Sequence, residues 1–201
     1  MKEQYYDSLL NIKTGGLQKG FSTSIHYHRY EPTPYSAMDT LFSQYEMNRH
    51  DRIVDFGCGK GRLNFYVNYF FQTEAVGIEM NKVFYEEAMN NLKRYEKKFK
   101  NRQKQIHFLC CLAEEYEIDP RDNKFYFFNP FSVQIFIGVI INILLSLNDA
   151  KRQIDLILYY ASEDYVFFLE NHTSFVMHKE IIIPELYEKN PYEKFLIYRL
   201  G

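Results

Sequence analysis

Three glycines alternate in the segment Val54–Arg62, and their spacing could bring the backbone close to a flat or extended ligand. Glycine adopts positive φ angles and lets a ligand approach without a Cβ clash. The segment lies between a short buried strand pattern and a helical pattern, which is where open parallel sheets bind ligands. Gly57 and Gly59 fit the dinucleotide pattern G-x-G-x-x-G, but Arg62 stands at its third glycine.

An acidic residue, Asp55, ends the strand just before this turn. A carboxylate at that position would repel a pyrophosphate and attract a cationic amino-acid group. The turn therefore favours a cofactor without phosphates. Two alternatives remain: a tight strand-to-helix turn that binds nothing, and a nicotinamide dinucleotide site.

A second acidic residue, Glu79, ends the next strand pattern about 20 residues after the glycine turn. A carboxylate in this position can accept hydrogen bonds from both hydroxyls of a ribose. An exposed charge at a strand end is the alternative. Together with the glycine turn, we interpret Glu79 as a ribose ligand.

The segment Val54–Gly61 resembles motif I of the class I S-adenosylmethionine-dependent methyltransferases, in which an acidic residue precedes G-x-G-x-G. The resemblance implies that the glycines border the methionine part of S-adenosylmethionine and that the acidic residue lies near its amino group. It also implies a ribose contact from Glu79 and adenine contacts near Met80 and after the third strand. The cofactor-binding residues that it implies in this core are Asp55, Gly57, Cys58, Gly59, Glu79, Met80 and Ala113.

The turn Asn129-Pro130-Phe131 follows the fourth strand pattern and resembles motif IV of the amino-group methyltransferases. That resemblance implies a catalytic role: the Asn side chain and a backbone carbonyl accept hydrogen bonds from the target nitrogen, and the aromatic ring packs on the target. The sequence departs from the usual motif in having a single proline. The alternative is a helix start with Asn129 as N-cap and Pro130 at the first helical position.

Residues before the first strand pattern are expected to form a cap over the methionine end of the cofactor. The segment Tyr30–Tyr35 is the best candidate, because two prolines stiffen it and it offers hydroxyl groups, so Thr33 and Tyr35 are expected to contact the cofactor. His26 and His28 are interpreted as surface residues, since no third metal ligand accompanies them. We expect no metal site.

Strand and helix patterns alternate from residue 52 onwards and predict an α/β fold: a doubly wound, Rossmann-like methyltransferase fold. Its sheet is expected to be mostly parallel and seven-stranded, with an antiparallel C-terminal edge pair. We expect a single domain over residues 1–201, in which residues 1–35 are an irregular cap segment and residues 36–201 are the Rossmann-like core. The expected strands are 52–56, 75–79, 106–110, 124–128, 154–159, 173–183 and 194–200; the expected helices are 36–47, with Ser36 as N-cap, 62–71, 82–98, 132–147 and 162–170, and a helical turn at 113–116.

The amino-acid composition reduces the number of possible functions. The formal net charge is −2, so the basic surplus of a general nucleic-acid binder is missing. A protein lysine or other amine is therefore the favoured methyl acceptor, and an RNA or DNA base is the alternative acceptor. A second alternative is that the protein is a cofactor-binding module without turnover that acts through partners.

The three cysteines have no metal-ligand spacing, and the adjacent Cys110 and Cys111 are expected in the core of a cytoplasmic protein. The apolar segment 131–147 is too short to span a membrane and is expected to be a buried helix.

Overall fold

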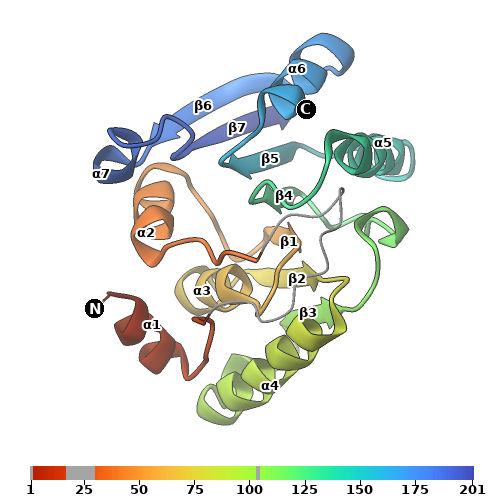
Figure 1. Ribbon diagram of the computed structural model, residues 1–201. Helices are drawn as coiled ribbons and strands as arrows, with labels where there is room; N and C mark the ends of the chain where they lie inside the picture. Colours follow the sequence, from red (N-terminus) through yellow and green to blue (C-terminus); the bar gives the residue numbers. More distant parts are fainter. Residues whose placement is uncertain (1, 17–29, 103–104) are drawn as a thin grey trace.

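The computed structural model describes residues 2–16, 30–102 and 105–201 and is built around one seven-stranded sheet (Figure 1). The strand order is β3-β2-β1-β4-β5-β7-β6. The first five strands pair in parallel, and β7 pairs antiparallel with both β5 and β6. The expected fold class is confirmed. The strands are β1 Arg52–Phe56, β2 Glu74–Ile78, β3 Ile106–Leu109, β4 Lys124–Phe127, β5 Ile154–Tyr159, β6 Val176–Ile182 and β7 Lys194–Leu200.

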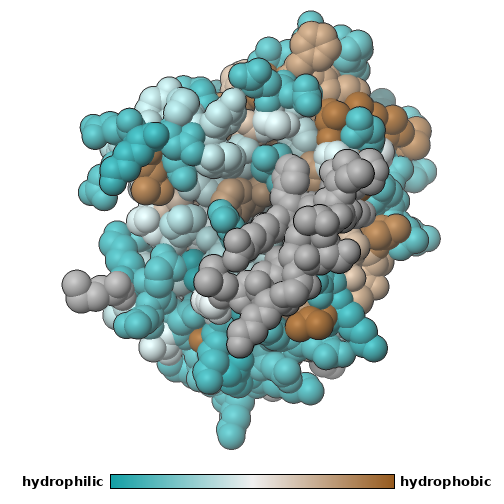
Figure 2. Space-filling model, in the orientation of Figure 1, coloured by the Kyte–Doolittle hydropathy of each residue, from teal (hydrophilic) through white to brown (hydrophobic). Residues whose placement is uncertain are grey.

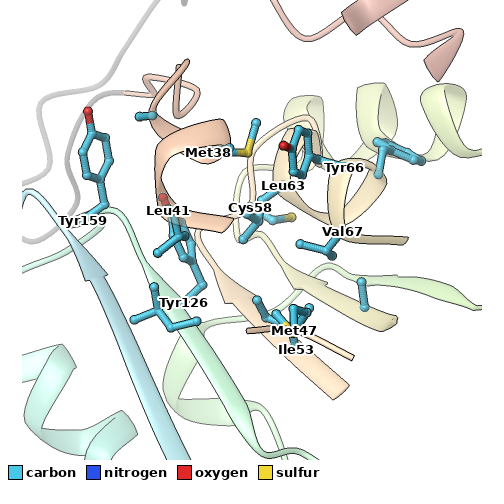
Figure 3. Close-up of a cluster of buried hydrophobic side chains, with 14 of the residues drawn as sticks. Met38, Leu41, Met47, Ile53, Cys58, Leu63, Tyr66, Val67, Tyr126 and Tyr159 are labelled. Carbon is cyan, nitrogen blue, oxygen red and sulfur yellow. The ribbon is translucent and has the colours of Figure 1, made fainter. Parts of the chain in front are cut away.

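Helices cover both faces of this sheet, because alternate side chains of the central strands point to opposite faces and both sets are apolar. In β1, Ile53 packs on one face and Val54 on the other. Helices α1 to α4 cover the face of Ile53, and α5 and α6 cover the opposite face (Figures 1 and 3). The helices are α1 Lys2–Leu10, α2 Tyr35–Gln44, α3 Arg62–Phe71, α4 Lys82–Lys98, α5 Val133–Asp149, α6 Glu163–His172 and α7 Pro184–Tyr187, with 3-10 turns η1 Lys100–Arg102 and η2 Ala113–Glu115.

The start of the chain differs from the expectation of an irregular segment, because residues 2–10 form α1. This helix has a weak apolar pattern of its own and depends on tertiary contacts: Leu10 is fully buried, and the ring of Tyr6 stacks on that of Tyr35 at 4.6 Å. The expected N-cap of α2 is also wrong. The helix begins one residue earlier, at Tyr35, with Pro34 before it, because the fixed φ of proline suits the entry to a helix.

The apolar helix α5 is only half buried, which corrects the expectation of a buried helix. Ile140 and Ile143 are fully buried against the sheet, whereas Ile141 is 47% and Leu145 56% exposed. Apolar residues gather over this helix in Figure 2, on a face that is otherwise mainly hydrophilic. Within the described residues, no helix reaches the length and apolarity needed to cross a bilayer.

Asp155 connects several strands near their amino-terminal ends. Its side chain is fully buried and accepts hydrogen bonds from Tyr45 Oη (2.6 Å), Lys124 Nζ (2.7 Å) and Arg199 Nε and Nη2 (2.7 and 2.8 Å). Burial alone would raise the pKa of this carboxyl, but the hydrogen bonds from Arg199, Lys124 and Tyr45 outweigh burial and lower the pKa to about 2. One carboxylate thus joins β4, β5, β7 and the segment that leads into β1.

Asp155→Asn should lower the free energy of unfolding by about 3–5 kcal/mol at pH 7, because it leaves buried cations without their anion. The folded-state pKa is depressed, so the contribution of Asp155 is complete above the unfolded-state pKa of about 3.9 and is lost as pH falls towards 2. Urea unfolding at pH 7 and pH 3 measures both effects. Asp149→Asn, at the exposed end of α5, is the matched control and should change stability by less than about 0.5 kcal/mol. A variant of Asp155 that is as stable as the control would contradict this account.

Candidate functional site

The glycine turn connects β1 to α3 at the point where the strand order reverses, between β1 and β4. Its three glycines all have positive φ angles: 78° at Gly57, 54° at Gly59 and 84° at Gly61. The amides of Gly57 and Cys58 both donate to the carbonyl of Ile78 (2.9 and 3.0 Å), which fastens the turn to the end of β2. The backbone is therefore held in a left-handed path that L side chains rarely adopt.

Each glycine of the turn is also in contact with another part of the chain. A Cβ on Gly57 would lie 2.7 Å from Cβ of Pro130, and one on Gly59 would lie 2.0 Å from the ring of Tyr30. A Cβ on Gly61 would lie 2.5 Å from the ring of Phe108. The turn is thus the place where the Asn-Pro-Phe turn and the N-terminal segment meet.

Glu79 lies directly beside this turn and is 7% exposed. One of its carboxylate oxygens accepts a hydrogen bond from the amide of Gly59 (2.8 Å), and the other accepts one from the amide of Asn81 (2.7 Å). Burial raises the pKa of Glu79, although these backbone donors oppose the shift. Each oxygen can accept one more hydrogen bond, so the carboxylate can take two hydroxyl donors. Met80, next in the chain, is 43% exposed.

Asp55 is 5% exposed, and no residue that the structure describes donates a hydrogen bond to its carboxylate. Its cross-strand partner is Tyr126, so both side chains lie on the face covered by α2 and α3. Burial, and then the charge of Glu79, raise the pKa of Asp55 well above its usual value. A buried carboxylate without a compensating donor is costly, and a cationic ligand would stabilise it. This feature fits a cofactor that carries a positively charged amino-acid group.

Asn129 follows β4 and has a φ of 40°, a strained conformation that asparagine tolerates better than most residues. Helix α5 begins only at Val133, with Ser132 in the N-cap position, so the alternative of Asn129 as a helix cap is wrong. Pro130 contacts Gly57, as described above. The ring of Phe131 is buried against Phe127 at 6.2 Å, so it lies in the core and not on an open surface.

The N-terminal segment is fastened over the turn by one buried guanidinium, that of Arg62. It donates to the Thr14 hydroxyl (2.7 Å) and the Thr33 carbonyl (3.1 Å), forms an ion pair with Glu3, and lies 4.5 Å from the ring centre of Tyr35. These contacts connect α1, the segment after it and the entry to α2 with the first residue of α3. The position that breaks the dinucleotide pattern therefore anchors the N-terminal segment.

Comparison with known proteins agrees with this geometry. Residues 34–127 match a family described as a methyltransferase domain. An RNA methyltransferase from Salinibacter ruber, solved with S-adenosyl-L-homocysteine, superposes with a TM-score of 0.56 at 14% identity, over 84% of this chain and 92% of that one. This chain has the fold of the class I methyltransferases. The expected resemblance is confirmed.

Other solved structures are similar to the same extent. The PH0226 protein from Pyrococcus horikoshii OT3 has a TM-score of 0.59 at 12% identity, covering 83% of this chain and 89% of that one. Geranyl diphosphate C-methyltransferase from Streptomyces coelicolor A3(2) has a TM-score of 0.53 at 10% identity, covering 82% and 77%. Curated protein sequences give no match.

Two residues of the expected methyltransferase site have their polar atoms engaged within the protein. The Thr33 hydroxyl shares a hydrogen bond with that of Tyr126 (2.7 Å), and the Tyr35 hydroxyl donates to Asp7 (2.7 Å). Tyr30, which the sequence placed only within a cap segment, lies closest to the turn: its hydroxyl donates to the Thr14 carbonyl (2.9 Å), and its ring packs on Phe84 at 4.7 Å.

The adenine side of a methyltransferase site would lie after β3. Ala113 is buried there at the start of η2. A cavity of about 320 Å³ at the end of β3 is lined by both adjacent cysteines but not by Ala113. Cys110 is exposed and Cys111 is half-buried, so the expectation that they are core residues is wrong; β3 ends at Leu109, before them. Cys58, by contrast, is buried.

No metal site is found within the described residues, where no three His, Cys, Asp or Glu side chains gather suitably. His26 and His28 lie outside those residues.

Arg62→Met should release the N-terminal segment while the sheet stays folded. We expect the free energy of unfolding to fall by about 2–4 kcal/mol, because charge-assisted hydrogen bonds are lost and buried acceptors are left unsatisfied. Amide hydrogen exchange in α1 should rise well above that in β1. Arg121→Met removes an arginine whose side chain is 63% exposed and should cost less than about 1 kcal/mol. Unchanged protection in α1 would show that Arg62 does not anchor this segment.

Proposed function

We propose that the protein is an enzyme that transfers a methyl group from S-adenosylmethionine. The observation that carries this proposal is the buried pair of carboxylates, Asp55 and Glu79, on either side of a turn with three positive-φ glycines. S-adenosylmethionine, when bound, supplies an electrophilic methyl group on a sulfonium. Cofactors of this kind are cationic at the sulfonium and the amino group, which suits two carboxylates that form no ion pair with the residues that the structure describes.

In this proposal, each site residue binds a different part of the cofactor. Asp55 attracts the amino group, while Gly57, Cys58 and Gly59 present backbone to the methionine part. Glu79 accepts hydrogen bonds from the ribose hydroxyls. Residues 1–35 act as a cap on this side of the 1–201 domain, with Thr33 and Tyr35 contributing to its wall; Met80 and Ala113 are assigned to the adenine.

We further propose that the methyl acceptor is a nitrogen atom and that Asn129 orients it. Pro130 contacts Gly57, so the Asn-Pro-Phe turn adjoins the end of the site where the methyl group would lie. The Asn129 amide oxygen can accept a hydrogen bond that tightens as the nitrogen attacks, which favours the transition state over the ground state. Phe131 supports the turn from the core, and its carbonyl accepts a hydrogen bond from Tyr165.

The structural relatives do not agree on an acceptor. They include an RNA methyltransferase, TrmK from M. capricolum and a C-methyltransferase of geranyl diphosphate. The net charge of −2 supports a protein lysine or other amine over a nucleic-acid base. Incubation with labelled S-adenosylmethionine and a cell extract tests the function directly: a transferase labels one fraction of the extract, whereas a binding module without turnover labels none.

Glu79→Ala should weaken binding of S-adenosylhomocysteine by about 10- to 100-fold, because two charge-assisted hydrogen bonds are lost and water compensates in part. Titration calorimetry measures the affinity, and thermal unfolding checks that the glycine turn is still folded. Glu86→Ala, at an exposed position of α4, is the charge-matched control and should bind as the wild type does. Unchanged affinity in a folded Glu79 variant would remove the ribose assignment.

Asn129→Ala should lower turnover by about 10²- to 10³-fold, comparable to the loss of one preorganised polar contact in an active site. The affinity for S-adenosylhomocysteine should hardly change, because Asn129 is assigned to the acceptor and not to the cofactor. Turnover and affinity are measured on the same preparation. A fully active variant would leave Asn129 with a conformational role only, and the proposal of a nitrogen acceptor would lose its main support.

A further inference from the structure

Aromatic side chains form a continuous wall at the carboxyl ends of β4 and β5 and on the loop that enters β7. Phe128 packs on Tyr159 (ring centres 4.6 Å apart) and lies 6.3 Å from Tyr160, which in turn packs on Tyr192 at 5.4 Å. Tyr159 is 1% exposed, Phe128 and Tyr160 are half-buried, and Tyr192 is 38% exposed. The wall therefore leads from the buried end of β5 out to solvent.

Backbone and side-chain bonds hold the wall in place. The side-chain amide of Asn190 donates to the Tyr160 hydroxyl, and the amide of Tyr160 donates to the carbonyl of Lys194 (3.3 Å). Tyr160 itself has a φ of 57°, a left-handed conformation that is costly for a bulky residue. Strained residues persist where the surroundings determine them, and they cluster at functional sites.

Carboxylates border the same wall. Glu193 accepts a hydrogen bond from the Tyr159 hydroxyl, and Glu163 accepts one from Tyr192 (3.4 Å). Burial raises the pKa of Tyr159, and its hydrogen bond to Glu193 and the charges of Glu193 and Glu31 raise it further. Of the nearby cations, Lys194 pairs with Glu180 (2.9 Å), and Lys189 is exposed on the preceding loop.

The aromatic wall and the candidate cofactor site lie along the same face of the sheet. Asp55 and Tyr126 are paired across β1 and β4, and Tyr159 lies on the same face of β5, two residues beyond the partner of Tyr126. Asp55 is nine-tenths buried and receives no hydrogen bond from the described residues. One end of this surface thus carries a buried carboxyl group without a donor from the described residues, and the other end carries the exposed Glu163 and the half-buried Glu193.

We propose that this wall, formed by Phe128, Tyr159, Tyr160 and Tyr192 and bordered by Glu163 and Glu193, is the acceptor site and that it binds a cationic primary amine. Ring faces and carboxylates both attract an ammonium group, and they do so most strongly where water is excluded. Nucleic acid would instead bring phosphates against carboxylates. The inference rests on the proposed methyl transfer and assigns its substrate class.

Methyl transfer to such an amine needs only the amine, water and the sulfonium of the cofactor. The bound ammonium loses one proton to water at the exposed end of the wall, which leaves a nitrogen lone pair. That pair forms the new bond to the methyl carbon, and the bond between this carbon and sulfur breaks, leaving its electron pair on sulfur as a thioether. The nitrogen then carries the positive charge, with its two remaining protons, and the product leaves along the same surface as a methylated ammonium.

The test uses labelled S-adenosylmethionine and a cell extract divided into protein, nucleic-acid and small-molecule fractions. We expect label in the protein or the small-molecule fraction, and prior acetylation of the amines of the extract should abolish it. Tyr192→Leu and Glu193→Gln should each reduce this labelling by about tenfold, the scale of one desolvated cation–aromatic or charge contact. Tyr5→Leu in α1 and Glu46→Gln after α2 are exposed matched controls and should label as the wild type does.

Affinity for S-adenosylhomocysteine, measured by calorimetry on every variant, separates this inference from the proposed function. Binding near the wild-type value together with reduced amine labelling supports the acceptor site. If the wild type binds S-adenosylhomocysteine but labels nucleic acid, labels acetylated extract equally well or labels nothing, the amine site is overturned while the cofactor site stands. Normal amine labelling by both wall variants would overturn the placement of the site. A wild type that does not bind S-adenosylhomocysteine would contradict the proposed function itself.

Discussion

The candidate site depends on the buried guanidinium of Arg62. A left-handed glycine turn can form at the end of any such strand, but nothing in the turn itself brings the N-terminal segment over it. Arg62, at the first position of α3, binds Glu3, Thr14 and the Thr33 carbonyl together. Because its guanidinium donates in a fixed planar fork, it fixes the directions of three separate segments at once. The ring of Tyr30 reaches Gly59 from the last of these segments.

The same constraint explains why glycine is needed at each position of the turn. Gly57, Gly59 and Gly61 combine positive φ angles with contacts that leave no room for a Cβ, each to a different part of the chain. Conformation and packing therefore point in the same direction, and the turn joins the Asn-Pro-Phe segment, the N-terminal segment and β3. A ligand held at this turn would be in reach of all three.

The regular elements could be predicted closely from the sequence, and the irregular connections could not. Strands β1, β5 and β7 and helices α3 and α4 have their expected bounds, because each is a strongly periodic segment between clear turn residues. Helix α1 was missed because its few apolar residues are ordered by distant partners such as Tyr35. The roles of Arg62 and Tyr30 could not be predicted for the same reason. In the sequence, Arg62 is only a departure from a glycine pattern and Tyr30 only a loop tyrosine, because their tertiary contacts are not visible there. Cys110 and Cys111 were misplaced because an apolar run continues beyond the end of β3.

Buried carboxylates lie at both ends of the strands, but within the described residues only those at the amino-terminal ends are paired with cations. This contrast supports a ligand site at the carboxyl-terminal ends. At the amino edge, Asp155 is surrounded by Lys124, Arg199 and Tyr45, and its pKa is lowered to about 2. At the carboxyl edge, Asp55 receives no such donor from the described residues, and burial beside Glu79 raises its pKa. Both carboxylates are nearly inaccessible to water, so burial alone does not distinguish them. A charge that served only stability would be paired within the chain, as Asp155 is, whereas an unpaired one destabilises the fold. In our proposal, a cationic ligand supplies the partner that the described residues do not offer to Asp55.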